Sequence, residues 1–201
     1  MHRTLIKFFY LNLFFVAPLL YSLEITTDGL LDEKEWSGAR EVTKYYESLP
    51  FTLDDASGSQ KVLVLEDEKG IYFGFISYQD VETIRSQKHQ RDEEMANADM
   101  VGVSIDFDGD GLLSYGFSIS AGGSILDNVV RNENEMNYDW DADWGYGVTI
   151  GKDAWYAEMF IPWSVAPMKA QTGDKRKVKL SFYRWLRGEF KVYTTIKGNP
   201  R

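Results

Sequence analysis

The fold is decided by residues 99–120, which read DMVGVSIDFDGDGLLSYGFSIS. Apolar residues alternate with small or polar residues on both sides of the segment Asp108-Gly109-Asp110-Gly111. A period of two residues sends alternate side chains to opposite faces of a strand, and Asp-Gly pairs are typical of tight turns. This stretch therefore predicts two antiparallel strands joined by a hairpin turn.

The same alternation recurs along most of the chain. Strands are expected at 62–65, 71–76, 101–106, 115–120, 155–161, 178–182 and 190–194, and turn signals separate them at 67–70, 108–111, 122–123 and 151–153. The main helical candidate is the segment 81–95, and Ile161–Val165 is expected to end a strand in a short helical turn. Short strands at this spacing predict an all-β, jelly-roll-like antiparallel β-sandwich.

The composition excludes several classes of function. The chain has 201 residues and a formal net charge of −9, which argues against binding to nucleic acid or to an anionic membrane surface. It contains no cysteine and only two histidines, His2 and His89. Disulfides, thiolate metal sites, a cysteine nucleophile and a multi-histidine metal centre are therefore excluded.

The first residues have the pattern of a secretory signal peptide. Arg3 and Lys7 precede an apolar run over 8–23 that Asn12 and Pro18 interrupt. A retained membrane anchor is the alternative, although this run is short for a bilayer span. We expect cleavage near Ser22, giving a signal peptide over 1–22 and one domain over 23–201. The mature domain is then secreted or periplasmic, with no membrane insertion after cleavage.

Several stretches resemble family-9 carbohydrate-binding modules. Residues 28–36 read DGLLDEKEW and match the opening pattern D-G-x-L-D-E-x-x-W of that family. The pieces 71–74, 99–106 and 154–163 follow in the family's order, over about residues 24–195. The stretch 138–144 is similar to a branch in which the module is the N-terminal domain of larger bacterial envelope proteins.

This resemblance implies a β-sandwich of the carbohydrate-binding-module type that binds an oligo- or polysaccharide of the xylan or glucan kind. Sugar-binding members clamp a terminal sugar between two aromatic rings, one before the strand that corresponds to 99–106 and one in the last loop. This sequence departs from the family there, because 93–98 hold no aromatic residue and the chain stops at Arg201. We expect a C-terminus shortened by a strand, which would leave a sheet edge unpaired.

Candidate sugar contacts lie in the acidic, tryptophan-rich segment. Trp140 and Trp144 stand among Asp139, Asp141 and Asp143, so two indoles can stack on a sugar while the carboxylates accept bonds from its hydroxyls. Packing of a tryptophan into the core is the alternative. Trp185, between Arg184 and Arg187, can also face a ligand or pack on an edge strand. Trp36 is assigned to packing at one end of the sandwich.

Other charged segments have plainer interpretations. Asp106, Asp108 and Asp110 match half of a calcium loop, but Phe117 stands where a closing Glu is needed, and a hairpin turn explains the same residues. The sequence therefore predicts no cofactor, with structural calcium as the alternative. The run from Arg91 to Glu94 is expected to be a solvated loop.

The functional expectation is a non-catalytic carbohydrate-binding module connected with polysaccharide catabolism. No serine–histidine arrangement or G-x-S-x-G motif is present, and an abundance of carboxylates does not by itself make a glycosidase. Two alternatives stay open. The chain can be a docking domain of the bacterial envelope without sugar affinity, bound to another envelope protein or domain, or an accessory part of a glycoside hydrolase whose O-glycosyl hydrolase activity lies in a partner domain.

Overall fold

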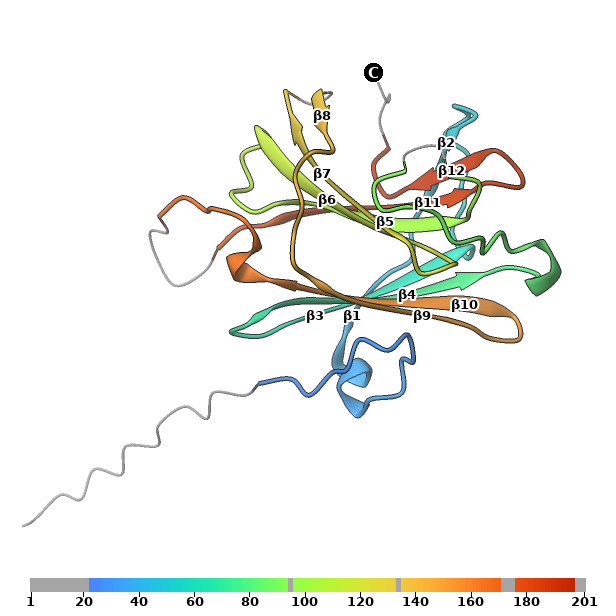
Figure 1. Cartoon of the computed structure of the whole chain (residues 1–201), viewed down its shortest axis with the longest axis horizontal. Coiled ribbons are helices and arrows are strands. Elements are labelled where there is room, and N and C mark those ends of the chain that lie inside the picture. Colours follow the sequence, from blue (N-terminus) through green and yellow to red (C-terminus); the bar gives the residue numbers. More distant parts are fainter. Residues whose placement is uncertain (1–21, 94–95, 133–134, 171–175, 198–201) are drawn as a thin grey trace, which may run out of the picture.

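The protein is a sandwich of two antiparallel sheets (Figure 1). The computed structural model describes residues 22–93, 96–132, 135–170 and 176–197. The predicted all-β antiparallel sandwich is confirmed. The predicted signal peptide over 1–22 lies, except for Ser22, outside the described residues. No described helix has the length and apolar character needed to cross a membrane.

Sheet A has five strands in the order β1-β3-β4-β10-β9. Their bounds are β1 Arg40–Val42, β3 Gln60–Glu66, β4 Gly70–Tyr78, β10 Ala154–Pro162 and β9 Gly145–Ile150. The central pair, β4 and β10, stays in register from Tyr78↔Ala154 to Gly70↔Pro162. Apart from Ser77 and Glu158, both strands are largely apolar on both faces, as expected for strands covered on both sides.

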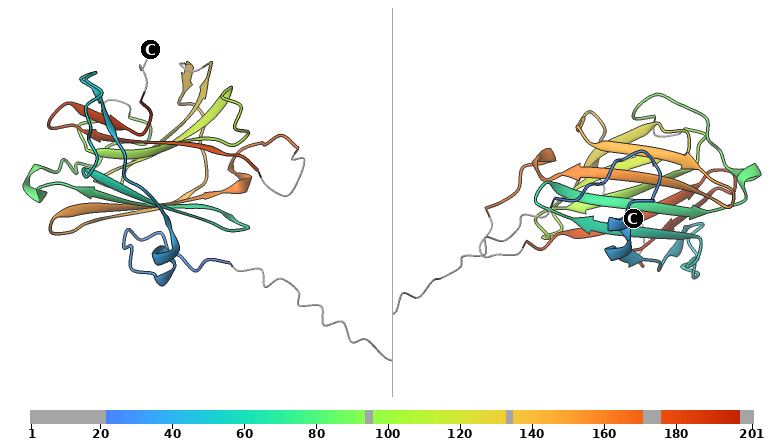
Figure 2. Two further views of the ribbon diagram at one scale, coloured as in Figure 1. Left: turned by 180° about the vertical axis from the view of Figure 1, so that it is seen from behind. Right: turned by 90° about the horizontal axis from the view of Figure 1, so that it is seen from below.

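Sheet B has seven strands in the order β2-β12-β11-β5-β6-β7-β8. Their bounds are β2 Tyr46–Leu49, β12 Lys191–Thr194, β11 Lys179–Leu186, β5 Met100–Asp106, β6 Leu113–Ser120, β7 Ile125–Arg131 and β8 Glu135–Asn137. The predicted hairpin over 99–120 is the β5–β6 pair, with Val103 opposite Phe117. Figures 1 and 2 show β8 and β2 rising away from sheet A, so that the outer face of sheet B is concave.

The main core lies between the inner faces of the two sheets. It is formed by alternate residues of the strands, including Phe73, Phe75, Val103, Phe117 and Met159, all fully buried. The intervening residues of each strand therefore point to the outer faces. On β5 and β6 these are mostly glycine and serine, so the outer face of sheet B carries small residues on these two strands.

The helix expected at 81–95 does not form in the described part of that segment. Only Val81–Thr83 is helical, as the 3-10 turn η2; the other short turns are η1, Lys34–Gly38, and η3, Trp163–Val165. The backbone N–H groups after η2 instead bind distant residues: Arg85 N–H donates to Asp99, His89 N–H to Ser124 Oγ and Asp92 N–H to the Ile125 carbonyl. These long-range bonds replace the helical i to i−4 pattern.

An N-terminal strap, residues 22–38, covers the outer face of sheet A (Figure 1). Trp36 is buried there in a second cluster with Leu63 and Tyr72. Trp36 is thus a packing residue, as expected, but it lies on the outer face of sheet A and not at one end of the sandwich. The strap covers only part of the outer face of sheet A, since Tyr78 on that sheet is 46% exposed.

Candidate functional site

The outer face of sheet B has a floor of small residues. Gly102 lies between Tyr183 and Ser118 on the neighbouring strands, and Ser104 lies between Ser181 and Gly116. A side chain at Gly102 would place its Cβ within 2.4 Å of the Tyr183 ring, so this ring lies directly over the glycine. The absence of a side chain at Gly102 therefore makes room for the Tyr183 ring.

Tyr183 is fixed in this floor by a hydrogen bond. Its hydroxyl lies 2.5 Å from Ser118 Oγ, on the far side of Gly102. Burial raises the pKa of Tyr183 to about 12, so it remains a neutral donor and acceptor at all physiological pH values. On the next strand, the Asn128 amide lies in the same way over Gly116, where an added Cβ would be 2.6 Å from its oxygen.

A groove of about 490 Å³ opens on this face at the end nearer the β5–β6 turn. We call it the serine groove, because Ser104, Ser114 and Ser181 line it together with aliphatic side chains that include Leu112, Val130 and Ile196. Leu112 is 67% exposed and Ile196 58% exposed. The volume lies within the range of roughly 300–1,000 Å³ that is common for small-molecule sites. Hydroxyl groups beside aliphatic surface suit a ligand that is both polar and apolar.

One charged pair lies in the serine groove. Lys179 Nζ is 3.9 Å from Asp106 Oδ2 and is half exposed. Asp106 itself is nearly buried, and it accepts backbone N–H bonds from Asp108, Gly109 and Gly111. The groove therefore has balanced charge and a rigid carboxylate at its end. This arrangement favours a neutral ligand over a charged one.

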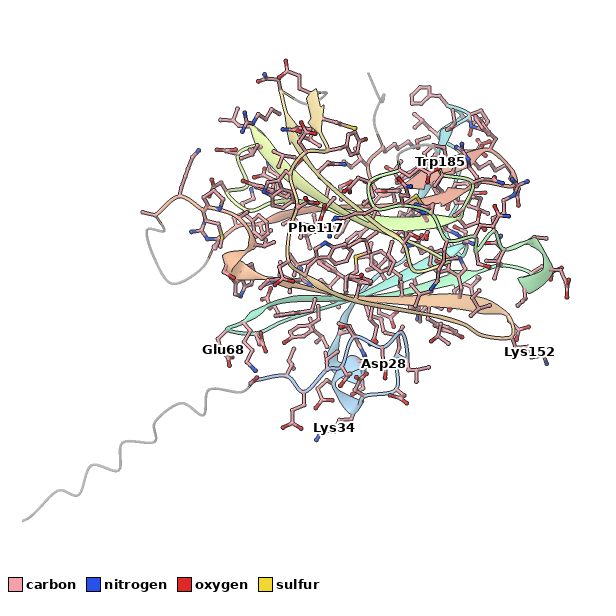
Figure 3. The ribbon with its side chains drawn as sticks, viewed as in Figure 1. Asp28, Lys34, Glu68, Phe117, Lys152 and Trp185 are labelled. Atoms are coloured by element: carbon pink, nitrogen blue, oxygen red, sulfur yellow. The ribbon has the colours of Figure 1, made fainter. Side chains whose placement is uncertain are left out.

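Trp185 lies on the same face, toward the other end of the strands (Figure 3). It is half buried, four residues along β11 from Ser181, a separation of about 13 Å in an extended strand. The Arg187 guanidinium lies 4.7 Å from the centre of its ring and 5.6 Å from that of Phe190, which is 59% exposed. Of the predicted sugar contacts, Trp185 is the aromatic residue that shares a face with the serine groove.

The structure places Trp140 and Trp144 in or against the core. Trp144 is 6% exposed, and Trp140 packs on Tyr115 and Phe117 with ring centres 4.9 and 5.9 Å apart. The prediction that Trp140 and Trp144 form a sugar-binding platform is therefore wrong, because the side chain of Trp144 is enclosed. Asp139 and Asp141 remain exposed on the connection from β8 to β9. Sequence composition does not reveal which way an indole on such a connection points.

Trp144 is held by a carboxylate that the sequence analysis did not single out. Asp127, fully buried on β7, accepts bonds through Oδ2 from Trp144 Nε1, the Ala142 N–H and Arg91 Nη2, at 2.9, 3.2 and 2.7 Å. Arg91 also pairs with Asp141 at 2.9 Å and Asp92 at 3.3 Å. The run from Arg91 is therefore not simply solvated, since it anchors the β8–β9 connection.

Asp106, Asp108 and Asp110, which match half of a calcium loop, lie at the end of β5 and in the β5–β6 turn. Asp108 Oδ1 accepts from Arg176 Nη1 and from the Lys169 N–H, both at 3.0 Å, and Asp110 Oδ2 lies 2.5 Å from Lys169 Nζ. Asp106 is engaged with turn amides and Lys179. Calcium requires six to eight oxygen ligands. This donor set does not fit it, because amides and basic side chains already surround the carboxylates.

One buried carboxylate connects two of the recognised sequence pieces. Glu158 on β10 accepts the N–H groups of Asp28 and Gly29 at 3.0 and 2.8 Å through Oε2, and the indole N–H of Trp36 at 3.2 Å through Oε1. Burial, together with the nearby charge of Glu33, raises the pKa of Glu158 to about 7. A raised pKa is common in catalytic acids. Glu158, however, lies beneath the strap and binds the strap's own donors, which makes it a structural residue.

Compared with protein-family models and with curated proteins, the sequence matches none. Solved structures do share the fold. One is a protein from Bacteroides uniformis named for an inferred carbohydrate-binding role, with TM-score 0.61, 12% identity, and 80% of this chain and 78% of that chain covered. Another is a family-9 carbohydrate-binding module from Caldicellulosiruptor kristjanssonii in complex with glucose, with TM-score 0.54, 16% identity, and coverage of 90% and 88%.

A family-9 module from the same organism, in complex with cellotriose, has TM-score 0.51, 17% identity, and coverage of 87% and 79%. At these identities the likeness is one of fold. The chain thus has the β-sandwich fold of family-9 carbohydrate-binding modules, as its sequence pieces led us to expect.

Proposed function

We propose that this chain is a non-catalytic carbohydrate-binding module whose sugar lies on the outer face of sheet B. The observation that carries the proposal is the serine groove, a 490 Å³ hollow with hydroxyl-bearing and aliphatic residues on an otherwise low face. Pyranose rings offer C–H faces to apolar side chains, and their hydroxyls need fixed polar partners. The groove supplies both kinds of partner.

The ligand in this proposal is a neutral, glucose-type oligosaccharide. The Asp106–Lys179 pair gives the groove no net charge, and solved structures of the same fold bind glucose and cellotriose. Trp185 lies about 13 Å from Ser181 along β11. A chain of two or three sugar rings is long enough to reach from the groove to this indole. We therefore assign Trp185 to the end of the ligand farther from the groove.

The absence of catalysis is part of the same proposal. The carboxylates described around the groove are engaged in the β5–β6 turn, and the buried Glu158 lies beneath the strap on the opposite sheet. A glycosidase needs two carboxylates facing one bound sugar. Any hydrolysis or polysaccharide catabolism then belongs to partner domains. Export, inferred from the secretory pattern of residues 1–22, completes the proposal and is tested by N-terminal sequencing of the mature protein.

Titration calorimetry with glucose, cellotriose and xylotriose tests the proposal. Ser181→Trp fills the groove and is expected to abolish binding, whereas Ser57→Trp, at an exposed loop position that does not line the groove, is expected to leave the affinity unchanged. Trp185→Ala should weaken cellotriose binding by about tenfold, as expected for loss of one ring contact of about 1.4 kcal/mol. Its matched control is Tyr78→Ala, which removes a 46% exposed ring on sheet A.

A docking function is the second candidate, because the residues around the groove are unusually apolar for a sugar site. Leu112, Ile196 and the nearby Met136 on β8 are all more than half exposed. If none of the sugars binds the wild type, or if Ser181→Trp leaves their affinity unchanged, carbohydrate binding at this face is refuted. The face is then assigned to another envelope protein.

A further inference from the structure

A second group of polar residues lies between the two sheets, at the end of the sandwich near the β9–β10 turn. Gln60, Ser77 and Trp155 are direct neighbours on β3, β4 and β10, because Ser77 pairs in register with both of the others. Their side chains point inward, in phase with the core residues Val62, Phe75 and Ala157. All three are at most 1% exposed.

Sheet B contributes a buried arginine to the same region. The Arg184 guanidinium donates to the carbonyls of Ser59 and Tyr78, which are the chain neighbours of Gln60 and Ser77. Tyr45 is also fully buried, and burial raises its pKa although the positive charge of Arg184 acts in the opposite direction. Side chains of both sheets, and Tyr45 from the connection between β1 and β2, are thus buried in the same end of the sandwich.

The hydrogen-bonding groups left over in this region are mainly donors. Six of the buried side-chain atoms that have no hydrogen-bond partner among the described residues belong to this region: Tyr45 Oη, Gln60 Nε2, Gln60 Oε1, Ser77 Oγ, Trp155 Nε1 and Arg184 Nε. Three of them can only donate, the two hydroxyls can donate, and Gln60 Oε1 alone can only accept. A buried polar atom without a partner is rare and destabilising. The set therefore calls for an occupant that accepts several hydrogen bonds.

The positive charge of the buried Arg184 also favours an occupant that accepts hydrogen bonds. No described carboxylate lies within ion-pair distance of Arg184. Its link to Asp99 runs through Gln79, which accepts from Arg184 Nη2 at 2.8 Å and donates to Asp99 Oδ2 at 2.9 Å. Burial lowers the pKa of Arg184 to about 10, because desolvation outweighs these compensating interactions. An occupant with a negative charge would offset that penalty more fully than a neutral water molecule.

We propose that Tyr45, Gln60, Ser77, Trp155 and Arg184 form an inter-sheet binding site for a small monovalent anion of chloride size. A halide ion has no hydrogen to donate and accepts hydrogen bonds from several directions, which matches a set of five donors. Its negative charge lies against the buried guanidinium. The ion joins β3, β4 and β10 of sheet A to β11 of sheet B, so it stabilises the sandwich at this end.

The direct test is a crystal of the whole protein soaked in sodium bromide, with diffraction data collected at the bromine absorption edge. We expect an anomalous peak within hydrogen-bond distance of Ser77 Oγ, Tyr45 Oη and Arg184 Nε. Density for a water molecule without an anomalous peak would overturn the proposal. This measurement uses the unaltered protein, so it does not depend on the folding of a variant.

A solution test uses thermal melting at constant ionic strength, with chloride replacing the much larger gluconate ion. The midpoint of the wild type is expected to rise by about 3–5 °C for each tenfold increase in chloride above its dissociation constant. The double variant Tyr45→Phe, Ser77→Ala should lose most of this rise, and the exposed-site control Ser57→Ala should retain it. An equal rise in the double variant and the wild type would contradict a site at these residues.

Discussion

Gly29 donates its backbone N–H to Glu158 Oε2 over 2.8 Å, although 129 residues separate the two positions. Gly29 comes from the opening sequence piece of the chain and Glu158 from the last long strand of sheet A. This contact fixes the strap on the outer face of sheet A. The two stretches that resemble a known family are therefore parts of one interaction. The serine groove lies on the outer face of the other sheet.

Gly29→Ala is expected to destabilise the protein by about 2–4 kcal/mol. Gly29 has a φ of +88°, and an added Cβ would lie 2.5 Å from the Val148 backbone. Both the backbone conformation and the contact with β9 therefore oppose a side chain. Urea unfolding measures the change. Gly38→Ala, where an added Cβ meets nothing within 4 Å, is the matched control and should change stability by less than about 0.5 kcal/mol. Equal effects of the two substitutions would contradict the strap contact.

Stability should depend on pH through Glu158. Folding raises the pKa of this carboxyl from 4.5 to about 7, so the folded state holds the proton more tightly than the unfolded state. The free energy of unfolding should therefore fall as pH rises from about 4.5 to about 7, and this contribution should be constant above that range. The difference between wild type and Glu158→Gln, followed by urea unfolding across this range, isolates the contribution. Parallel pH profiles of the two proteins would refute it.

Asp127→Asn should destabilise the protein by about 2–4 kcal/mol, because one buried oxygen of Asp127 accepts three hydrogen bonds. The emission of Trp144 should also change, because its indole N–H loses a charged partner. Asp141→Asn is the control within the same cluster. Its carboxylate is 71% exposed, so its pair with Arg91 should contribute less than about 1 kcal/mol. A large loss with Asp141→Asn and a small loss with Asp127→Asn would reverse this account.

Removal of calcium should leave the thermal midpoint unchanged. Asp106, Asp108 and Asp110 are paired with amides, Lys169, Arg176 and Lys179, so no oxygen cage is available in the β5–β6 turn. Differential scanning calorimetry with EDTA and with added calcium chloride measures this directly. A midpoint that rises with calcium and falls again with EDTA would show that the turn rearranges around the ion.

The strands were predictable from the sequence, because the alternation at 99–120 and 154–162 is a local property of β5, β6 and β10. The position of the strap was not, since it depends on Glu158, which lies far along the chain. The enclosure of Trp144 likewise depends on Asp127, whose burial no local pattern reveals. The serine groove could not be predicted from the sequence for a related reason. Serine and glycine on the outer positions of β5 and β6 do not by themselves indicate a binding site. The groove forms only because the pairing of neighbouring strands brings Ser104, Ser114 and Ser181 together.

The proposal that a sugar binds on the outer face of sheet B is best tested by a crystal structure of the protein with cellotriose. We expect electron density for the sugar in the serine groove. The sugar hydroxyls should bond to Ser104 or Ser181, and the sugar ring farthest from the groove should lie toward Trp185. Sugar density only outside the outer face of sheet B, or no sugar at saturating concentration, would contradict it.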